Sequence, residues 1–211
     1  MRKAPLLISL FLLSFGLLIP ASAQELLFDF EDGTGQGWTN VSWDTELPHA
    51  FTPTNDSAEN GSDFPVPAGG DYQMVPIVFE AADGNNVRDG AHALLLTRSP
   101  EFLLTEGDLS VSISGGDAHG ELPSKPSDLA VSTDAGEGVK AQGFGLRRVS
   151  DDTYVATGAR STNDDIYQAV VIPSADLVDF VSDTETYTID VFDSSAGGWG
   201  WIAFDEVKVP G

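Results

Sequence analysis

The stretch Leu109-Ser110-Val111-Ser112-Ile113-Ser114 alternates apolar and hydroxyl side chains without a break. Successive side chains of a β-strand point to opposite faces of its sheet, so this alternation predicts a strand with one face on a core and one polar face. The stretch Tyr187-Thr188-Ile189-Asp190-Val191 repeats the pattern. We therefore predict two half-buried antiparallel strands at these positions.

Similar segments, cut by Gly, Asp, Asn and Pro, occur along the rest of the chain, and no stretch keeps a helical apolar period over three turns. The further predicted strands are Leu26–Phe30, Trp38–Trp43, Gln73–Glu80, Ala91–Thr97, Phe102–Thr105, Asp128–Ser132, Phe144–Ser150, Tyr154–Arg160, Tyr167–Ile172 and Trp201–Val209. One short helix is predicted over Ser174–Phe180, with Ser174 as its cap. Many short strands separated by turns predict an all-β antiparallel sandwich, a jelly roll.

Two stretches rich in Pro, Gly, Asn and Asp, residues 44–72 and 115–140, are predicted to be long loops. Between Val149 and Tyr154, the pair Asp151-Asp152 predicts the turn of a hairpin, because Asp tolerates turn conformations. Nothing else divides the chain after its first residues. We expect a single domain over residues 24–211.

The first residues have the features of a cleavable signal peptide. Basic Arg2 and Lys3 precede an apolar run from Leu6 to Ile19, and Ala21-Ser22-Ala23 offers small residues for cleavage before Gln24. The run is shorter than the roughly 20 residues of a membrane-spanning helix. We therefore expect a signal peptide over residues 1–23, a secreted or periplasmic product, and no membrane insertion after cleavage.

The mature chain is strongly acidic. It keeps all 33 acidic residues but only eight basic ones, a net charge of −25, and it has no cysteine. Such a surface repels nucleic acid, so we expect no nucleic-acid partner. The charge suits a saline habitat or divalent cations, and the lack of cysteine excludes disulfides and thiol chemistry.

Several motifs in this order resemble the galactose-binding-like jelly rolls, a group that includes many carbohydrate-binding modules of secreted bacterial proteins. They are the opening Leu27-Phe28-Asp29-Phe30-Glu31-Asp32-Gly33 with Gly37-Trp38, the stretch from Gly90 to Phe102, Ile113–Gly116, Gly145–Arg148, and the closing Gly197-Gly198-Trp199-Gly200-Trp201 with Asp205. Trp201 departs from the pattern, because a His often follows the Trp-Gly. The resemblance implies a sandwich that binds carbohydrate or another cell-surface polymer.

The resemblance also implies a structural calcium ion between neighbouring first and last strands. The residues carried over are Glu31, the carbonyl of Gly33, and Asp205, with Asp32 and Asp193 as helpers. A hard cation prefers several oxygens that mix carboxylates and turn carbonyls, which agrees with this set. The alternative is that these are ordinary turn and surface acids, which are abundant in this chain.

Recognition of sugar rings requires flat aromatic surfaces together with polar side chains that bond hydroxyl groups. The candidates are Trp43, Tyr72, Tyr154, Tyr167 and Trp201, with Arg98, Arg147, Arg160, Asn163 and Asp165. The spacing of these residues does not show which of them share a face. The alternative for each is a packing role, and for Arg160 an ion pair with an acid such as Asp164; Trp38 and Trp199 are expected to pack.

No catalytic motif is present: the sequence has neither Gly-x-Ser-x-Gly nor His-Glu-x-x-His. The leading hypothesis is therefore a secreted non-catalytic module that binds carbohydrate or a cell-surface polymer and carries a structural calcium ion. A structural or adhesive matrix protein is the first alternative. The second is a polysaccharide hydrolase with two facing carboxylates, whose separation would be diagnostic.

Overall fold

The computed structural model describes residues 25–41, 49–55, 57, 65–78, 95–115, 122–129, 141–162, 164–194 and 202–210. The predicted signal peptide therefore lies outside the described residues. None of the described helices has the length and apolar character needed to cross a membrane.

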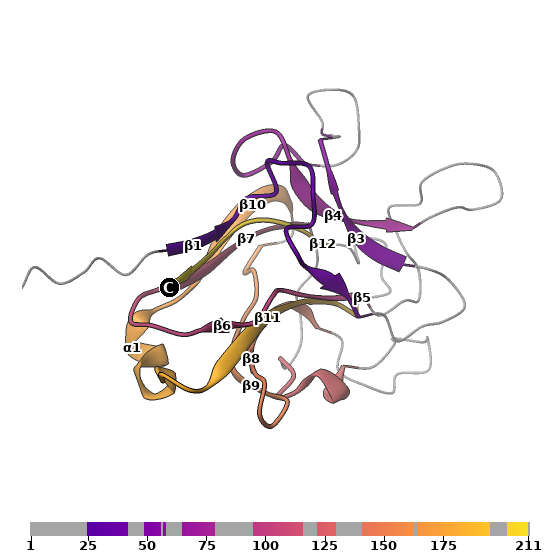
Figure 1. Cartoon of the computed structure of the whole chain (residues 1–211). Coiled ribbons are helices and arrows are strands. Elements are labelled where there is room, and N and C mark those ends of the chain that lie inside the picture. Colours follow the sequence, from indigo (N-terminus) through magenta and orange to yellow (C-terminus); the bar gives the residue numbers. More distant parts are fainter. Residues whose placement is uncertain are drawn as a thin grey trace, which may run out of the picture.

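The described strands form two antiparallel sheets, which Figure 1 shows as an upper and a lower layer. Sheet A has the order β10 (Asp164–Ile172), β7 (Leu109–Gly115), β12 (Ile202–Pro210), β4 (Gln73–Val78) and β3 (His49–Thr54), with β1 (Glu25–Phe28) also paired to β12. Sheet B has the order β2 (Thr39–Asn40), β5 (Leu95–Arg98), β11 (Thr186–Asp193), β8 (Gln142–Arg148) and β9 (Thr153–Gly158), with β6 (Phe102–Leu103) paired to β11. The predicted all-β sandwich is confirmed.

The main core lies between the sheets and is rich in aromatic rings. The ring centroid of Phe204 on β12 lies 5.6 Å from that of Phe30, 5.3 Å from that of Phe51 and 5.0 Å from that of Trp38. Trp38 is buried, so its predicted packing role is confirmed. Because β1 pairs with β12, with Phe28 opposite Val207, the turn that follows β1 lies beside the last strand.

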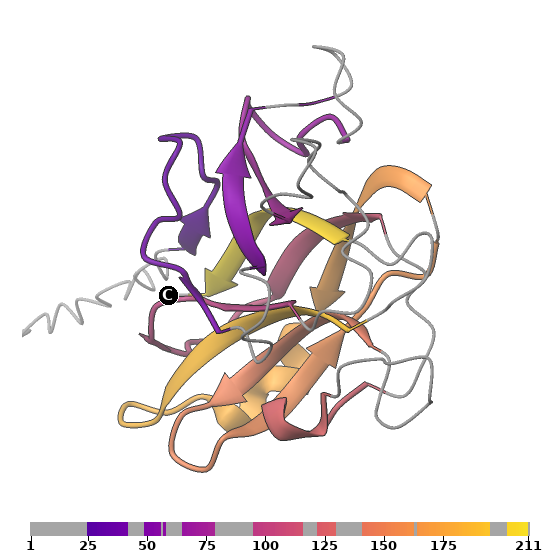
Figure 2. The same cartoon turned by 90° about the vertical axis from the view of Figure 1, so that its right-hand side faces the viewer.

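The prediction that the strands over Leu109–Ser114 and Tyr187–Val191 are half-buried is wrong. These strands, β7 and β11, are buried on both faces. Ser114 and Asp190 are both 0% exposed, although they stand on the outer, polar sides of their strands. Residues 65–72 lie over part of sheet A, where the Gly69 N–H donates to the Asp205 carboxylate. Residues 122–129 lie over part of sheet B, where Leu122 and Leu129 pack with Tyr154. Figure 2 shows η2 (Pro126–Asp128) of the second segment beside β9.

The prediction of a long loop over residues 44–72 is wrong for His49–Thr54. These residues form β3, which pairs residue by residue with β4. Pro53 suggests a loop in the sequence, but β3 is an edge strand of sheet A, where a proline removes no ladder hydrogen bond. The predicted strand Asp128–Ser132 is wrong at its start, because Asp128 ends the 3₁₀ turn η2. Residues 130–132 lie outside the described residues.

The predicted hairpin is confirmed: β8 pairs with β9 across a turn in which Asp152 has a left-handed φ of 58°. The helix over Ser174–Phe180 is confirmed as α1 (Ser174–Leu177) followed by η3 (Val178–Phe180). Its predicted cap is wrong. The Ser174 N–H donates to Asp108 Oδ1 at 2.7 Å, so an acid from the loop before β7 satisfies this end of the helix.

Candidate binding site

The segment from Pro65 to Tyr72 lies where the turn after β1 meets the last strand, β12. Two prolines and two adjacent glycines keep it out of the sheet. Gly70 has a left-handed φ of 60°, and a Cβ atom there would lie 2.1 to 2.3 Å from the carboxyl atoms of Glu31. Only glycine allows this backbone to approach Glu31 so closely.

Glu31 holds this segment through backbone hydrogen bonds. Its carboxylate accepts the Asp71 N–H at 2.8 Å on Oε2 and the Tyr72 N–H at 2.9 Å on Oε1. The turn that presents Glu31 is tight, with left-handed φ values at Phe30 and Gly33 and a 2.8 Å hydrogen bond from Gly33 N–H to the Phe30 carbonyl. A Cβ atom at Gly33 would lie 3.2 Å from the Tyr72 ring, so this turn and Tyr72 pack together.

Asp205 approaches the same segment from β12. Its side chain is completely buried, and its carboxylate accepts the Gly69 N–H at 3.1 Å and the Glu206 N–H at 2.7 Å. Glu206 has a left-handed φ of 43° and lies within the β-bulge that follows Asp205. Burial raises the pKa of Asp205 to about 7. Among the described residues, no basic side chain pairs with this carboxylate.

The residues predicted to hold calcium thus meet on one short segment: Glu31 at Asp71 and Tyr72, Gly33 at the Tyr72 ring, and Asp205 at Gly69. Asp205 is buried and has no basic side chain beside it among the described residues, so the charge of this site is compatible with a bound metal ion. The geometry fits less well, because the carboxylate oxygens accept backbone N–H groups. In the part of the chain that the structure describes, no three His, Asp or Glu side chains form a metal-binding group.

The two predicted helper acids have other contacts. Asp32 accepts hydrogen bonds from the backbone and hydroxyl of Thr34, and the hydroxyl bond is the main cause of its lowered pKa. Asp193 lies on β11 of sheet B and accepts a hydrogen bond from Gln142 Nε2 at 3.0 Å. Asp193 is therefore on the other sheet from Asp205.

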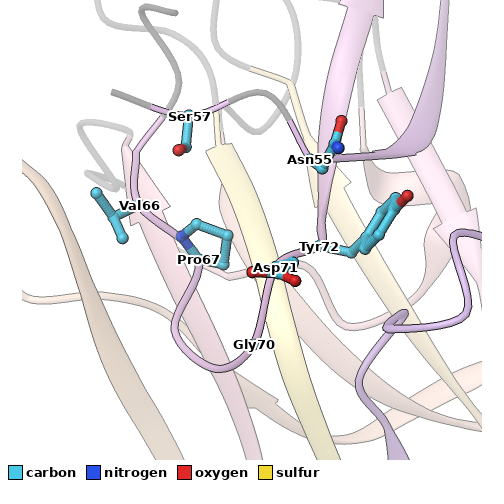
Figure 3. A pocket seen from close by; sticks show the side chains of 7 residues that line it. All are labelled: Asn55, Ser57, Val66, Pro67, Gly70, Asp71 and Tyr72. Atoms are coloured by element: carbon cyan, nitrogen blue, oxygen red, sulfur yellow. The ribbon is translucent and has the colours of Figure 1, made fainter. Parts of the chain in front are cut away.

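Beside Gly70 the surface opens into a pocket of about 450 Å³. Figure 3 shows Asn55 and Ser57 across the pocket from the segment that carries Val66 and Asp71. The lining residues are Asn55, Ser57, Val66, Pro67, Gly70, Asp71 and Tyr72. An aromatic ring, apolar side chains, a carboxylate, an amide and a hydroxyl therefore surround one space, which is the combination that sugar recognition requires.

Three other predicted ligand residues, Arg98, Arg147 and Tyr154, come together on the outer face of sheet B. Arg98 forms a bidentate ion pair with Asp190 at 2.7 and 2.8 Å, and the Tyr154 hydroxyl donates to the same carboxylate at 3.0 Å. Arg147 pairs with Asp152 at 2.5 Å. Burial raises the pKa of Tyr154. The polar groups of this face largely bond one another.

Tyr167 and Arg160 are associated with sheet A. The Tyr167 hydroxyl donates to Gln73 Oε1 at 2.6 Å, and burial, followed by the charge of Asp205, raises the pKa of Tyr167. Arg160 is buried, pairs with Asp164 as the sequence suggested, and donates to the Gly115 carbonyl. Trp43, Trp199, Trp201 and Asn163 lie outside the described residues, as does the side chain of Asp165.

Sequence reasoning missed Asn55, Ser57 and Asp71, because all three fall in the stretch predicted as a long loop. The signal was nevertheless present. Gly69-Gly70-Asp71-Tyr72 places an acid and an aromatic directly after two glycines, a pattern that brings polar and aromatic side chains onto a tight loop. Only the fold shows that Asn55 and Ser57 lie opposite.

No protein-family model matches the sequence, and no curated protein is significantly similar to it. Among solved structures, the chain is similar to the K1 cleaved adhesin domain of Lys-gingipain from Porphyromonas gingivalis W83, with 12% identity over 88% of this chain and 97% of that one and a TM-score of 0.46. It is also similar to a family 11 carbohydrate-binding module from Clostridium thermocellum, in complex with a β-1,3-1,4-mixed-linked tetrasaccharide (10% identity, 90% and 98% covered, TM-score 0.46). A third is CBM27-1 of Caldicellulosiruptor saccharolyticus in complex with mannohexaose (14%, 89% and 97%, TM-score 0.41).

Proposed function

We propose that this chain is a secreted, non-catalytic module that binds carbohydrate or a cell-surface polymer through the pocket beside Tyr72. The observation that carries the proposal is the pocket itself, in which Tyr72, Asp71 and Asn55 surround about 450 Å³. The Tyr72 ring offers an apolar surface for a sugar ring, and Asp71 and Asn55 offer hydrogen bonds to hydroxyl groups. Secretion rests on the signal-peptide features of residues 1–23.

A structural calcium ion beside Asp205 and Glu31 is part of the proposal. Its support is the charge: a buried carboxylate without a basic partner among the described residues, and a second carboxylate at the same segment. A bound cation would offset the cost of burying the charge of Asp205. The ion would also hold the backbone that carries Asp71 and Tyr72.

The proposed function is tested by retention on immobilised neutral, basic and acidic polysaccharides, with and without calcium. We expect retention of the wild type and at least a tenfold loss of affinity in Tyr72→Ala, since covering the apolar surface of a large side chain contributes on the order of 1.5–3 kcal/mol. Arg147→Gln, on the other sheet, is the matched control and should keep its affinity. Loss in Arg147→Gln but not in Tyr72→Ala would move the site to sheet B, and no retention of the wild type would end the proposal.

One feature favours the adhesive alternative. On edge strand β10, Ile166 is 72% exposed and Val171 is 51% exposed, and an exposed apolar edge can pair with another chain. This alternative expects self-association, which size-exclusion chromatography over a range of concentrations would detect. A monomer at all concentrations that still binds polysaccharide would argue against it.

A further inference from the structure

The pocket has a one-sided charge. Asp71 is the single charged residue among the described lining residues, and its exposed carboxylate accepts no hydrogen bond from the described residues. None of the described lining residues is Lys or Arg. A ligand with a positive group would therefore meet an available carboxylate, whereas an acidic sugar would find no basic side chain among these residues.

The surroundings strengthen this charge. On the other side of the same segment, Glu206 Oε1 lies 2.6 Å from the position that a Cβ atom of Gly69 would take, and the Glu31 carboxyl lies against Gly70. The arginines with ion pairs bond aspartates on other elements, namely Asp190, Asp152, Asp151 and Asp164. No ion pair among the described residues joins Glu31 or Glu206 to a basic side chain, so in the absence of a bound metal ion these carboxylates add negative charge beside the pocket.

Tyr72 also lines the pocket, and its ring packs beside Gly33. A carboxylate accepts a charge-assisted hydrogen bond from an ammonium group, and an aromatic ring near the same pocket adds a weaker attraction for a cation. Asp71 and Tyr72 are consecutive residues that line one pocket. Resting on the proposed function, we propose that this pocket selects an amine-bearing sugar, a glucosamine unit within a glycan, and that Asp71 is the residue that determines this specificity.

The test compares three β-1,4-linked tetramers of equal length by isothermal titration calorimetry at pH 6, where the amine carries a proton. They are the glucosamine tetramer, the N-acetylglucosamine tetramer, which keeps the nitrogen without its charge, and cellotetraose, which has a hydroxyl group in its place. We expect the glucosamine tetramer to bind the wild type at least tenfold more tightly than either neutral tetramer. Raising the salt concentration should narrow the difference.

Two variants locate the effect. Asp71→Asn should reduce affinity for the glucosamine tetramer about tenfold more than it reduces affinity for the neutral tetramers, because only the glucosamine tetramer loses a charge interaction. Asp179→Asn removes the same charge from an exposed residue of η3 and should change neither affinity. Circular dichroism and the melting temperature confirm that both variants are folded.

The outcomes separate the two proposals. Equal affinity for all three tetramers, or tighter binding of a neutral one, overturns the amine specificity and leaves carbohydrate binding in place. Equal loss in Asp71→Asn and Asp179→Asn shows that net charge alone causes the preference, which overturns the role of Asp71. If no tetramer and no polysaccharide binds, carbohydrate binding itself fails and the specificity fails with it.

Discussion

A completely buried aspartate lies on the outer face of each sheet, Asp190 on sheet B and Asp205 on sheet A, and the two carboxylates have different partners. On sheet B, Asp190 receives a bidentate ion pair from Arg98 and a hydrogen bond from the Tyr154 hydroxyl. On sheet A, Asp205 receives hydrogen bonds only from backbone N–H groups among the described residues, and burial raises its pKa to about 7. Among the described residues, a basic side chain therefore neutralises Asp190 and none neutralises Asp205.

This difference shows where an external partner would stabilise the molecule. A cation near Asp190 would compete with Arg98, which already occupies both carboxylate oxygens. A cation near Asp205 would meet a buried charge without a basic partner among the described residues. The pocket opens at the segment that Asp205 and Glu31 hold, so the unneutralised face is also the face that we propose to bind ligands.

The largest expected loss of stability comes from removing the ion pair between Arg98 and Asp190 on sheet B. Arg98→Met should leave Asp190 buried with only hydroxyl partners and should lower the free energy of unfolding by about 3–5 kcal/mol, the usual cost of removing one partner of a buried pair. Urea denaturation at pH 7.5 with a chelator measures this. The raised pKa of Arg98, due mainly to its hydrogen bond with Asp190, agrees with a strong pair.

Asp205→Asn is the matched change on the other face. In the same chelated buffer it removes a buried charge that has no basic partner among the described residues. Its single amide oxygen can accept only one of the N–H groups of Gly69 and Glu206, which Asp205 accepts on separate oxygens. Because these two effects oppose each other, the loss in the free energy of unfolding should be clearly smaller than in Arg98→Met. Equal losses in the two variants would show that the faces do not differ in this way.

Calcium should stabilise only those variants that keep Asp205 on sheet A. At a free concentration 100 times the dissociation constant, a bound ion raises the free energy of unfolding by about 2.7 kcal/mol. The wild type and Arg98→Met should both gain this amount when calcium replaces the chelator, and Asp205→Asn should gain nothing. Differential scanning calorimetry measures the shift. An unchanged melting temperature in the wild type would remove the calcium ion from the proposal.

The backbone of the segment can be tested through its glycines. Gly70→Ala places a side chain at a left-handed φ and against the Glu31 carboxyl, so it should cost about 1–2 kcal/mol and displace Asp71 and Tyr72, which lowers glycan affinity. Gly35→Ala is the control, because a Cβ atom there would meet only the Trp38 carbonyl at 3.9 Å. Calorimetric titration and urea denaturation of both variants check this. Unchanged affinity in Gly70→Ala would separate the segment from ligand binding.

Alternation of apolar and polar residues, with turn residues between the segments, was sufficient to predict the sandwich and most of its strands. The pair Asp151-Asp152 was sufficient to predict the β8–β9 hairpin. The alternation could not predict burial of Ser114 and Asp190, because that depends on which segments cover the outer faces. Alternation shows which side chains share a face but not what packs on it. Pro53 concealed β3 for a related reason, since its tolerance depends on an edge position that only the pairing reveals.

The candidate site was partly predictable. The resemblance predicted a calcium site at Glu31, Gly33 and Asp205, and the structure places each of them against the segment from Gly69 to Tyr72. That they bind calcium stays a prediction. The pocket beyond them was not predictable, because Asn55 and Asp71 are ordinary loop residues in the sequence. Their proximity is set by the pairing of β3 with β4 and by the hydrogen bonds of Glu31.

The smallest effect is expected at the exposed hairpin of sheet B, where Arg148 pairs with Asp151 at 2.6 Å. The hydrogen bond from Arg148 is the main cause that lowers the pKa of Asp151 to about 2. Because this value lies below the roughly 3.9 of an unfolded chain, the ionised pair stabilises the fold above pH 4 and loses its effect as the pH falls toward 2. Solvent and salt screen an exposed pair, so the contribution is small.

Asp151→Asn should therefore be slightly less stable than the wild type at neutral pH, and the difference should decrease steadily between pH 4 and pH 2. Urea midpoints across this range measure it, and 0.5 M sodium chloride should reduce the difference at pH 7. A difference that stays constant down to pH 2 would show that the charge of Asp151 does not cause it. The Thr153 hydrogen bond would not cause it either, because the amide oxygen of Asn can still accept that bond. The ion pair with Arg148 would then contribute nothing to stability, in contrast to the buried pair of Arg98 with Asp190 on the same sheet.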